Sequence, residues 1–161
     1  MVGRKNEKAK TVKPAPRSTQ LRGQQTRQKI LQTAARCMVE DSIHGLRYSH
    51  IAKVAKVPQA LMGYHFPNHE LLLLEMITAE LEKLKKLSVE KLEKFAASPK
   101  KALAAYIRVP FELAQSDKEF VAVWSCFYHV ATVNSLFAEQ GAAIRKMGRE
   151  RITNLVTMVL A

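Results

Sequence analysis

One short segment of the chain carries side chains that could recognise DNA. Within residues 47–66, RYSHIAKVAKVPQALMGYHF, three side chains suit base or phosphate contacts: Gln59, Ala60 and Tyr64. A glutamine amide can form two hydrogen bonds with adenine, an alanine methyl can touch the methyl of thymine, and a tyrosine hydroxyl can donate to a phosphate. These contacts require exposure on one face of a helix, so the surrounding residues must build and hold that helix.

The apolar residues of the segment predict a helix-turn-helix. A first helix is expected over residues 48–55 and a second over residues 58–65. Lys56 and a buried Val57 make the turn between them, and Pro67 stops the second helix. The inward side chains are expected to be Ile51, Ala52, Val54, Ala55, Leu61 and Met62, with His65 or Phe66. Such a pair can place its second helix in the major groove of DNA.

The rest of the chain is predicted to be helical as well, so the expected fold class is all-α. Residues 24–40 form a helix, and residues 41–45 break it with Gly45 in the left-handed conformation. Asn68 caps a long helix that reaches Phe95, with an exposed charged face around Glu80. Its inward stripe is expected at Leu71, Leu74, Ile77, Leu81, Leu84, Leu92 and Phe95. Further helices are expected over residues 99–115, 118–131 and 134–161.

The charge of the chain favours a polyanionic partner. The chain holds 26 Lys and Arg against 14 Asp and Glu, a formal net charge of +12. Half of the excess lies in residues 1–22, which are predicted to form a disordered basic arm that either lies along DNA or keeps the chain soluble. Cys37 and Cys126 are far apart and no apolar run could cross a bilayer, which indicates a cytoplasmic protein without a membrane partner.

Three stretches between Thr26 and Leu74 resemble the DNA-binding domain of tetracycline-repressor-type regulators. They are TRQKILQTAARCMVE, IAKVAKVPQALMGYHF and FPNHELLL. The form PQALMGYHF is most similar to the choline-responsive betaine-regulator branch, and a weaker similarity extends over residues 118–156. The resemblance implies a ligand-responsive regulator, a repressor that reads a palindromic operator through the 58–65 helix. The residues expected to contact double-stranded DNA are Arg47, Ser49, Lys53, Lys56, Pro58, Gln59, Ala60, Gly63, Tyr64, His65 and His69.

Several positions depart from the family pattern. The family usually has Gly where Lys56 stands, Ser where Pro58 stands and Thr where Arg47 stands. The family usually has a phosphate-binding Lys where His69 stands, and a larger residue is common at the position of Gly63. DNA binding as a class is therefore expected to survive, but the base preference of the family does not carry over.

The resemblance also implies domains and a small-molecule effector. It divides the chain into the arm at 1–22, a helix-turn-helix domain at 23–70 and a helical effector and dimerisation domain at 71–161. Candidates to line the effector pocket are Tyr106, Phe111, Trp124, Phe127 and Tyr128, which could cage a quaternary ammonium. The last three recur at helical spacing, however, and core packing is the favoured interpretation.

No pattern predicts an enzyme, a cofactor or a metal site. Cys126 and His129 offer two metal ligands on one helical face, which is half a site. His65 and His69 are separated by the break at Pro67. Phosphate-binding glycine loops, nucleophile elbows and paired-carboxylate arrangements are not found in the sequence.

The final helix ends in an apolar stripe. Its residues are Ile152, Leu155, Val156, Val159 and Leu160. Regulators of this family normally continue with about two more helices that form the dimer interface, so the domain is expected to be truncated relative to the family. The stripe either packs within the domain or pairs with another chain. A homodimer, or a heterodimer with a relative, is expected; the alternative function is an interaction partner that pairs with a full-length relative without strong DNA binding of its own.

Overall fold

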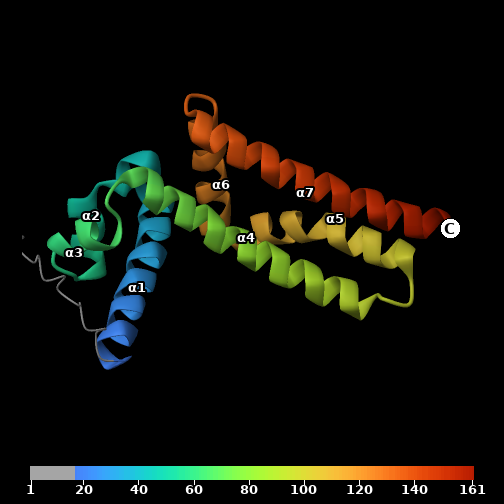
Figure 1. Ribbon diagram of the computed structural model, residues 1–161, viewed down its shortest axis with the longest axis horizontal. Helices are drawn as coiled ribbons and strands as arrows, with labels where there is room; N and C mark the ends of the chain where they lie inside the picture. Colours follow the sequence, from blue (N-terminus) through green and yellow to red (C-terminus); the bar gives the residue numbers. More distant parts are fainter. Residues whose placement is uncertain (1–16) are drawn as a thin grey trace, which may run out of the picture.

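The computed structural model describes residues 17–161, with side chains from residue 21 onward. This part of the chain contains seven α-helices and one 3₁₀ helix and no strand, which confirms the all-α prediction (Figure 1). The elements are α1 (Arg17–Asp41), η1 (Ser42–Leu46), α2 (Tyr48–Ala55), α3 (Ala60–His65), α4 (His69–Lys94), α5 (Pro99–Ser116), α6 (Lys118–Ala131) and α7 (Ser135–Leu160).

The helices separate into two groups along the long axis of the molecule. Figure 1 shows α2 and α3 at one end against α1, whereas α5 and α7 lie toward the other end, where the chain finishes. The long helix α4 runs from the first group into the second, and α6 crosses steeply between α1 and α7. Because α4 and α6 both contact α1, a movement of either helix would be transmitted to α1.

Helix α1 begins seven residues earlier than predicted. The sequence predicts a disordered arm that includes residues 17–22, and that prediction is wrong because these residues form the first turns of α1. The residues after Pro16 include Gln20, Leu21 and Arg22, which are strong helix formers and extend the helix toward the proline. The rest of the predicted arm, residues 1–16, lies outside the described part of the chain.

The break after α1 depends on Gly45 for a different reason from the one predicted. In the described residues the left-handed conformation belongs to Ser42 (φ 53°) and Lys56 (φ 52°), and no glycine has a positive φ. Gly45 is buried in η1, and a Cβ there would overlap the backbone carbonyl of Cys37. Glycine is required by close approach, not by backbone conformation.

Side-chain caps define three of the helix starts. The Asn68 side chain accepts a hydrogen bond from the Leu71 amide at 2.7 Å, as predicted for the start of α4. Asp117 accepts from the Phe120 amide at 2.9 Å at the start of α6. At the start of α7, Asn134 accepts from the Leu136 amide, two residues ahead, at 3.0 Å. These caps fix where the chain turns between long helices.

The buried face of α4 is rotated from the predicted stripe. The buried residues of α4 are Leu72, Leu73, Met76, Ile77, Glu80 and Ser88, so only Ile77 of the predicted set is fully inward. Residues 71–74 are all leucine, and periodicity alone cannot choose between the two faces that they offer. The packing of α4 against α1, α5 and α6 decides the choice. It also buries Glu80, which the sequence placed on an exposed face.

Candidate nucleic-acid interface

The turn between α2 and α3 is closed by a left-handed residue. Lys56 adopts φ 52° and ψ 50°, and its amide donates to the carbonyls of Ala52 and Lys53. The Val57 amide then bonds to the Ala52 carbonyl at 3.0 Å. A left-handed residue with a Cβ costs roughly 1–2 kcal/mol, so Lys56 occupies a position that would favour glycine.

Helix α3 starts two residues later than predicted. Leu61 and Met62 donate to the carbonyls of Pro58 and Gln59, both at 3.0 Å, and these three-residue closures form a tight first turn before Ala60. Further along, Met62 is fully buried together with Phe66, which follows the helix directly. These two anchors, one helical turn apart, fix which side of α3 faces outward.

The outward side of the reading helix is largely solvent-exposed. Tyr64 is 79% exposed. Ten of the eleven residues predicted to contact DNA are exposed to solvent: Arg47, Ser49, Lys53, Lys56, Pro58, Gln59, Ala60, Gly63, Tyr64 and His69. His65 is half-buried instead. Burial, with the nearby Arg27 charge, lowers the pKa of His65, so its imidazole is neutral near pH 7. We call this exposed set, without His65, the reading face.

The reading face is cationic and unpaired. Arg47, Lys53 and Lys56 form no ion pair with a carboxylate in the described part of the chain. Residues 42–69 contain these three cations and no acid. The positive charge is therefore free to meet phosphates. Of the residues predicted to lie inward near this face, Val54 is exposed, and Ile51, Ala52 and Ala55 fill the inner side of α2.

Two residues that the sequence did not single out hold the reading helix in place. The Tyr48 hydroxyl donates to the Phe66 carbonyl at 2.8 Å, and its ring stacks on His69 at 4.3 Å between centroids. Arg27 forms an ion pair with Glu75 of α4, and its guanidinium lies 4.9 Å from the centre of the Phe66 ring. The end of α3 is thus bound to α1, α2 and α4 together.

The five aromatic residues predicted for an effector pocket differ in their surroundings, and none of them lines the cleft between α1, η1 and α6 that is described below. Phe127 is fully buried and Trp124 packs on it at 5.9 Å, while Tyr128 stacks on Trp124 at 5.6 Å. Phe111 is 63% exposed and Tyr106 is half-buried on the same helix, α5. The three predicted aromatics on α6, Trp124, Phe127 and Tyr128, pack on one another.

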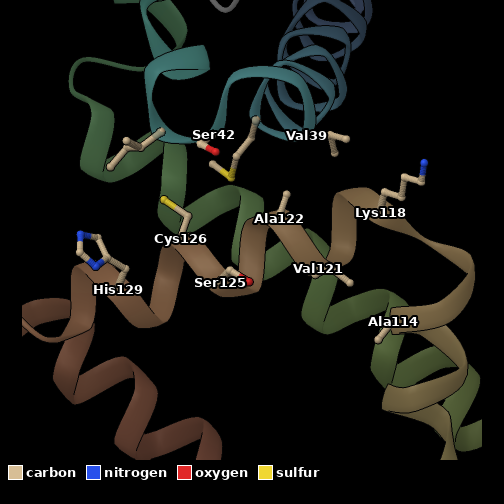
Figure 2. Close-up of a pocket in the computed structure, with 11 residues that line it drawn as sticks. Val39, Ser42, Ala114, Lys118, Val121, Ala122, Ser125, Cys126 and His129 are labelled. Atoms are coloured by element: carbon tan, nitrogen blue, oxygen red, sulfur yellow. The ribbon is translucent and has the colours of Figure 1, made fainter.

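A cleft lies where α1 and η1 meet α6. It has a volume of about 570 Å³, and Figure 2 shows Val39 and Ser42 on one wall and Ala122 and Cys126 on the other. Lys118 and His129 lie at opposite ends of the cleft. Burial raises the pKa of the Cys126 thiol, which keeps it protonated. Among the described residues no three His, Cys, Asp or Glu side chains form a potential metal site.

No helix in residues 17–161 is long and apolar enough to cross a membrane.

Comparison with known proteins relates the chain to transcriptional regulators. No protein-family model matches it. The chain is 34% identical over 105 residues to the HTH-type transcriptional regulator BetI of Rhizobium meliloti (strain 1021), a match that covers 65% of this chain and 51% of BetI. The matched region thus spans about half the length of that relative.

Two solved structures share the fold. One is a protein from Saccharomonospora viridis described as a transcriptional regulator and solved in complex with choline, with a TM-score of 0.76, 20% identity and coverage of 85% of this chain and 71% of that chain. The other is a protein from Streptomyces coelicolor A3(2), also described as a regulator, with a TM-score of 0.64, 24% identity and coverage of 74% and 68%.

Proposed function

We propose that the chain, which is 34% identical over 105 residues to the regulator BetI, is a ligand-responsive DNA-binding regulator of the tetracycline-repressor type that represses transcription. The observation that carries this proposal is the reading face, which combines an exposed helix with three unpaired cations. Its buried anchors, Met62 and Phe66, would hold α3 rigid as it enters the major groove. The protein would act in the cytoplasm.

Base contacts in this proposal come from the outward side chains of α3. Gln59 lies at the start of the helix and Tyr64 near its end, so the two would reach different parts of one half-site. Arg47, Lys53 and Lys56 would contact the phosphates on either side. The half-buried His65, held neutral by its surroundings, would support the helix without adding charge.

A dimer would place two reading faces on a palindromic operator. The apolar stripe of α7 supports this arrangement, because only Leu155 of its five residues is buried. Ile152, Val156, Val159 and Leu160 are exposed along α7. Pairing of two copies through this helix would remove that apolar area from water. We assign residues 23–70 to DNA binding and residues 71–161 to effector binding and dimerisation.

The effector in this proposal is a small molecule that binds the helical body. The similar protein from Saccharomonospora viridis was solved with choline, which makes a quaternary ammonium the first effector to test. Trp124, Phe127 and Tyr128 could cage such an ion only if their packed cluster opened. Binding would change the placement of α4 relative to α1 and thereby separate or twist the two reading faces.

An electrophoretic shift on the DNA that flanks the gene of this protein tests the proposal. We expect a specific complex that is weakened by Gln59→Ala and by Tyr64→Ala. Gln140→Ala is the matched control, because Gln140 is exposed on α7, away from the reading face. Equal binding by all four proteins would remove the assigned reading face.

The exposed stripe of α7 also supports a second candidate function. The chain could pair with a longer relative through this helix and silence it, without binding DNA strongly itself. Light scattering with a salt titration of DNA affinity separates the two functions. A homodimer whose DNA affinity falls steeply with salt supports the regulator, and a monomer with weak DNA binding supports the interaction partner.

A further inference from the structure

The cleft between α1, η1 and α6, which we call the α1/α6 cleft, offers an apolar surface that solvent reaches. Three of its aliphatic side chains are well exposed: Val39 by 38%, Val121 by 41% and Ile43 by 47%. Ala114, at the end of α5, and Ala122 extend this surface. Aliphatic groups that converge on one accessible hollow gain free energy when an apolar molecule replaces water there.

One wall of the α1/α6 cleft is formed in advance by a strained turn. Ser42, the first residue of η1, has φ 53°, a left-handed conformation that is unfavourable for a residue with a Cβ. Gly45 lies so close to the Cys37 carbonyl that a Cβ would overlap it, which holds η1 against the end of α1. Strained backbone that the surrounding packing maintains is concentrated at functional sites. The turn leaves Ser42 and Ile43 on the wall of the cleft instead of in the core.

The opposite wall of the α1/α6 cleft is one face of α6. Its lining residues recur at three- and four-residue steps and are Lys118, Val121, Ala122, Ser125, Cys126 and His129 (Figure 2). The first and the last of them are separated by three turns of helix, a span of about 16 Å. The volume of about 570 Å³ lies within the roughly 300–1,000 Å³ of small-molecule sites. An occupant would therefore be an elongated small molecule.

The charge at the end of the cleft selects among such molecules. Among the described residues, no Asp or Glu lines the α1/α6 cleft. Lys118 is exposed and forms no ion pair within residues 17–161. The adjacent Asp117 carboxylate is already bound to Lys83 at 3.0 Å and caps α6. Glu40 and Glu119 line an adjoining hollow and not the cleft itself. The unpaired charge at the cleft is thus positive.

We propose that the α1/α6 cleft binds an elongated aliphatic carboxylate, with its chain on the apolar walls and its carboxylate at Lys118. Binding would remove the apolar surface of the chain and of both walls from water, and Lys118 would gain a counter-charge. An ammonium ion of the same length would meet Lys118 as a like charge. A short acid such as acetate would leave the apolar walls in contact with water.

The position of the cleft gives this carboxylate a route to the reading face. Its walls come from α1, which packs on α2 in the DNA-binding half, and from α6 of the helical body. An occupant would set the spacing between these two helices. This regulatory step rests on the proposed function, whereas binding of the carboxylate itself does not.

Calorimetric titration of the whole chain with octanoate tests the site. Octan-1-ol and octylammonium are the neutral and the cationic analogues. We expect octanoate to bind, the alcohol to bind about two- to fivefold more weakly, because an exposed ion pair is lost, and the ammonium ion to bind more weakly still. Lys118→Gln should also lower octanoate affinity about two- to fivefold. Lys101→Gln is the matched control, because Lys101 is exposed on α5 outside the cleft.

The thiol of Cys126 reports whether the ligand lies in the cleft. Cys126 lines the cleft and is half-buried, whereas Cys37, the other cysteine of the chain, is only 1% exposed. N-ethylmaleimide should therefore label Cys126, and octanoate should slow this labelling in proportion to the fraction of protein that it occupies. Ser125→Trp fills the cleft from an exposed position and should abolish octanoate binding, whereas Gln140→Trp on α7 should not.

The proposal is overturned if octanoate does not bind at millimolar concentration, or if octan-1-ol or octylammonium binds as tightly. It is also overturned if octanoate leaves the labelling rate of Cys126 unchanged, or if Ser125→Trp binds octanoate like wild type. DNA affinity without any ligand is measured on the same proteins. Loss of octanoate binding with DNA affinity retained contradicts this site alone, and octanoate binding without DNA affinity contradicts the regulator proposal alone.

Discussion

Replacement of Lys56 by glycine should make the protein more stable and its DNA complex weaker. Lys56 holds φ 52° at the end of α2, and a side chain in that conformation costs roughly 1–2 kcal/mol. Glycine removes this cost but adds about 0.5–1 kcal/mol of backbone entropy to the unfolded chain. The expected net gain in the free energy of unfolding is about 0.5–1 kcal/mol, which should raise Tm by about 2 °C.

The DNA complex should respond in the opposite direction. Lys56 is exposed and has no ion pair among the described residues, so its charge is available to a phosphate. Its loss should reduce the slope of log affinity against log salt by about one. Urea unfolding gives the stability, and fluorescence anisotropy over a salt series gives the slope.

Lys53→Gln separates the two effects. Lys53 is exposed on α2 one turn before the left-handed position, and its replacement removes one charge without a change of backbone conformation. We expect a similar loss of salt slope and little change in stability. The reasoning is refuted if Lys56→Gly destabilises the protein, or if Lys53→Gln stabilises it equally.

Three further predictions concern stability. Gly45→Ala should lower the free energy of unfolding by about 1–3 kcal/mol or more, because the new methyl would overlap the Cys37 carbonyl; urea unfolding that matches wild type would contradict this. Asn68→Ala should lower the free energy of unfolding by about 1 kcal/mol, because the cap on the Leu71 amide is lost. Asn68→Asp should keep most of the wild-type stability in the same assay, because a carboxylate can also accept this hydrogen bond. The pKa of His65 is lowered in the folded state, so the unfolded chain takes up a proton first as pH falls. Stability should therefore decline as pH falls from about 6.5 through the folded pKa, and His65→Gln should remove this part of the decline; an unchanged pH profile would show that His65 is not the group responsible.

Helix boundaries were predictable where local chemistry sets them. The side chains of Asn68 and Asp117 accept hydrogen bonds from amides three residues ahead, so a short stretch of sequence is enough to predict each of these helix starts. The start of α1 was not predictable in this way, because Arg17 to Arg22 combine charge with strong helix formers. The composition of these residues suggested disorder, whereas in the structure they continue the helix.

The reading face was predictable in its exposure, whereas its supports were not. Met62 and Phe66 are apolar residues one turn apart, which leaves the opposite side of α3 for solvent. Tyr48 and Arg27 hold this helix through contacts 18 and 39 positions away in the chain. Spacing within a single helix carries no information on such contacts.

The burial of Glu80 could not be predicted from the sequence for a related reason. Glu80 belongs to a charged run whose i,i+3 and i,i+4 spacing is typical of an exposed face. Its burial depends on the side of α4 that meets α1 and α6, and the four leucines at 71–74 do not determine that side. Tertiary packing therefore buries a glutamate that the sequence pattern places on the surface.

Selection of DNA from a random-sequence pool tests the central claim most directly, because the operator sequence need not be known in order to run it. The wild-type chain should enrich a palindrome with two equal half-sites, and Gln59→Ala should relax the preference at one position in each half while Gln140→Ala enriches the wild-type sequence. Recovery of no preferred sequence, or of the same sequence by wild type and Gln59→Ala, would contradict DNA recognition through the reading face.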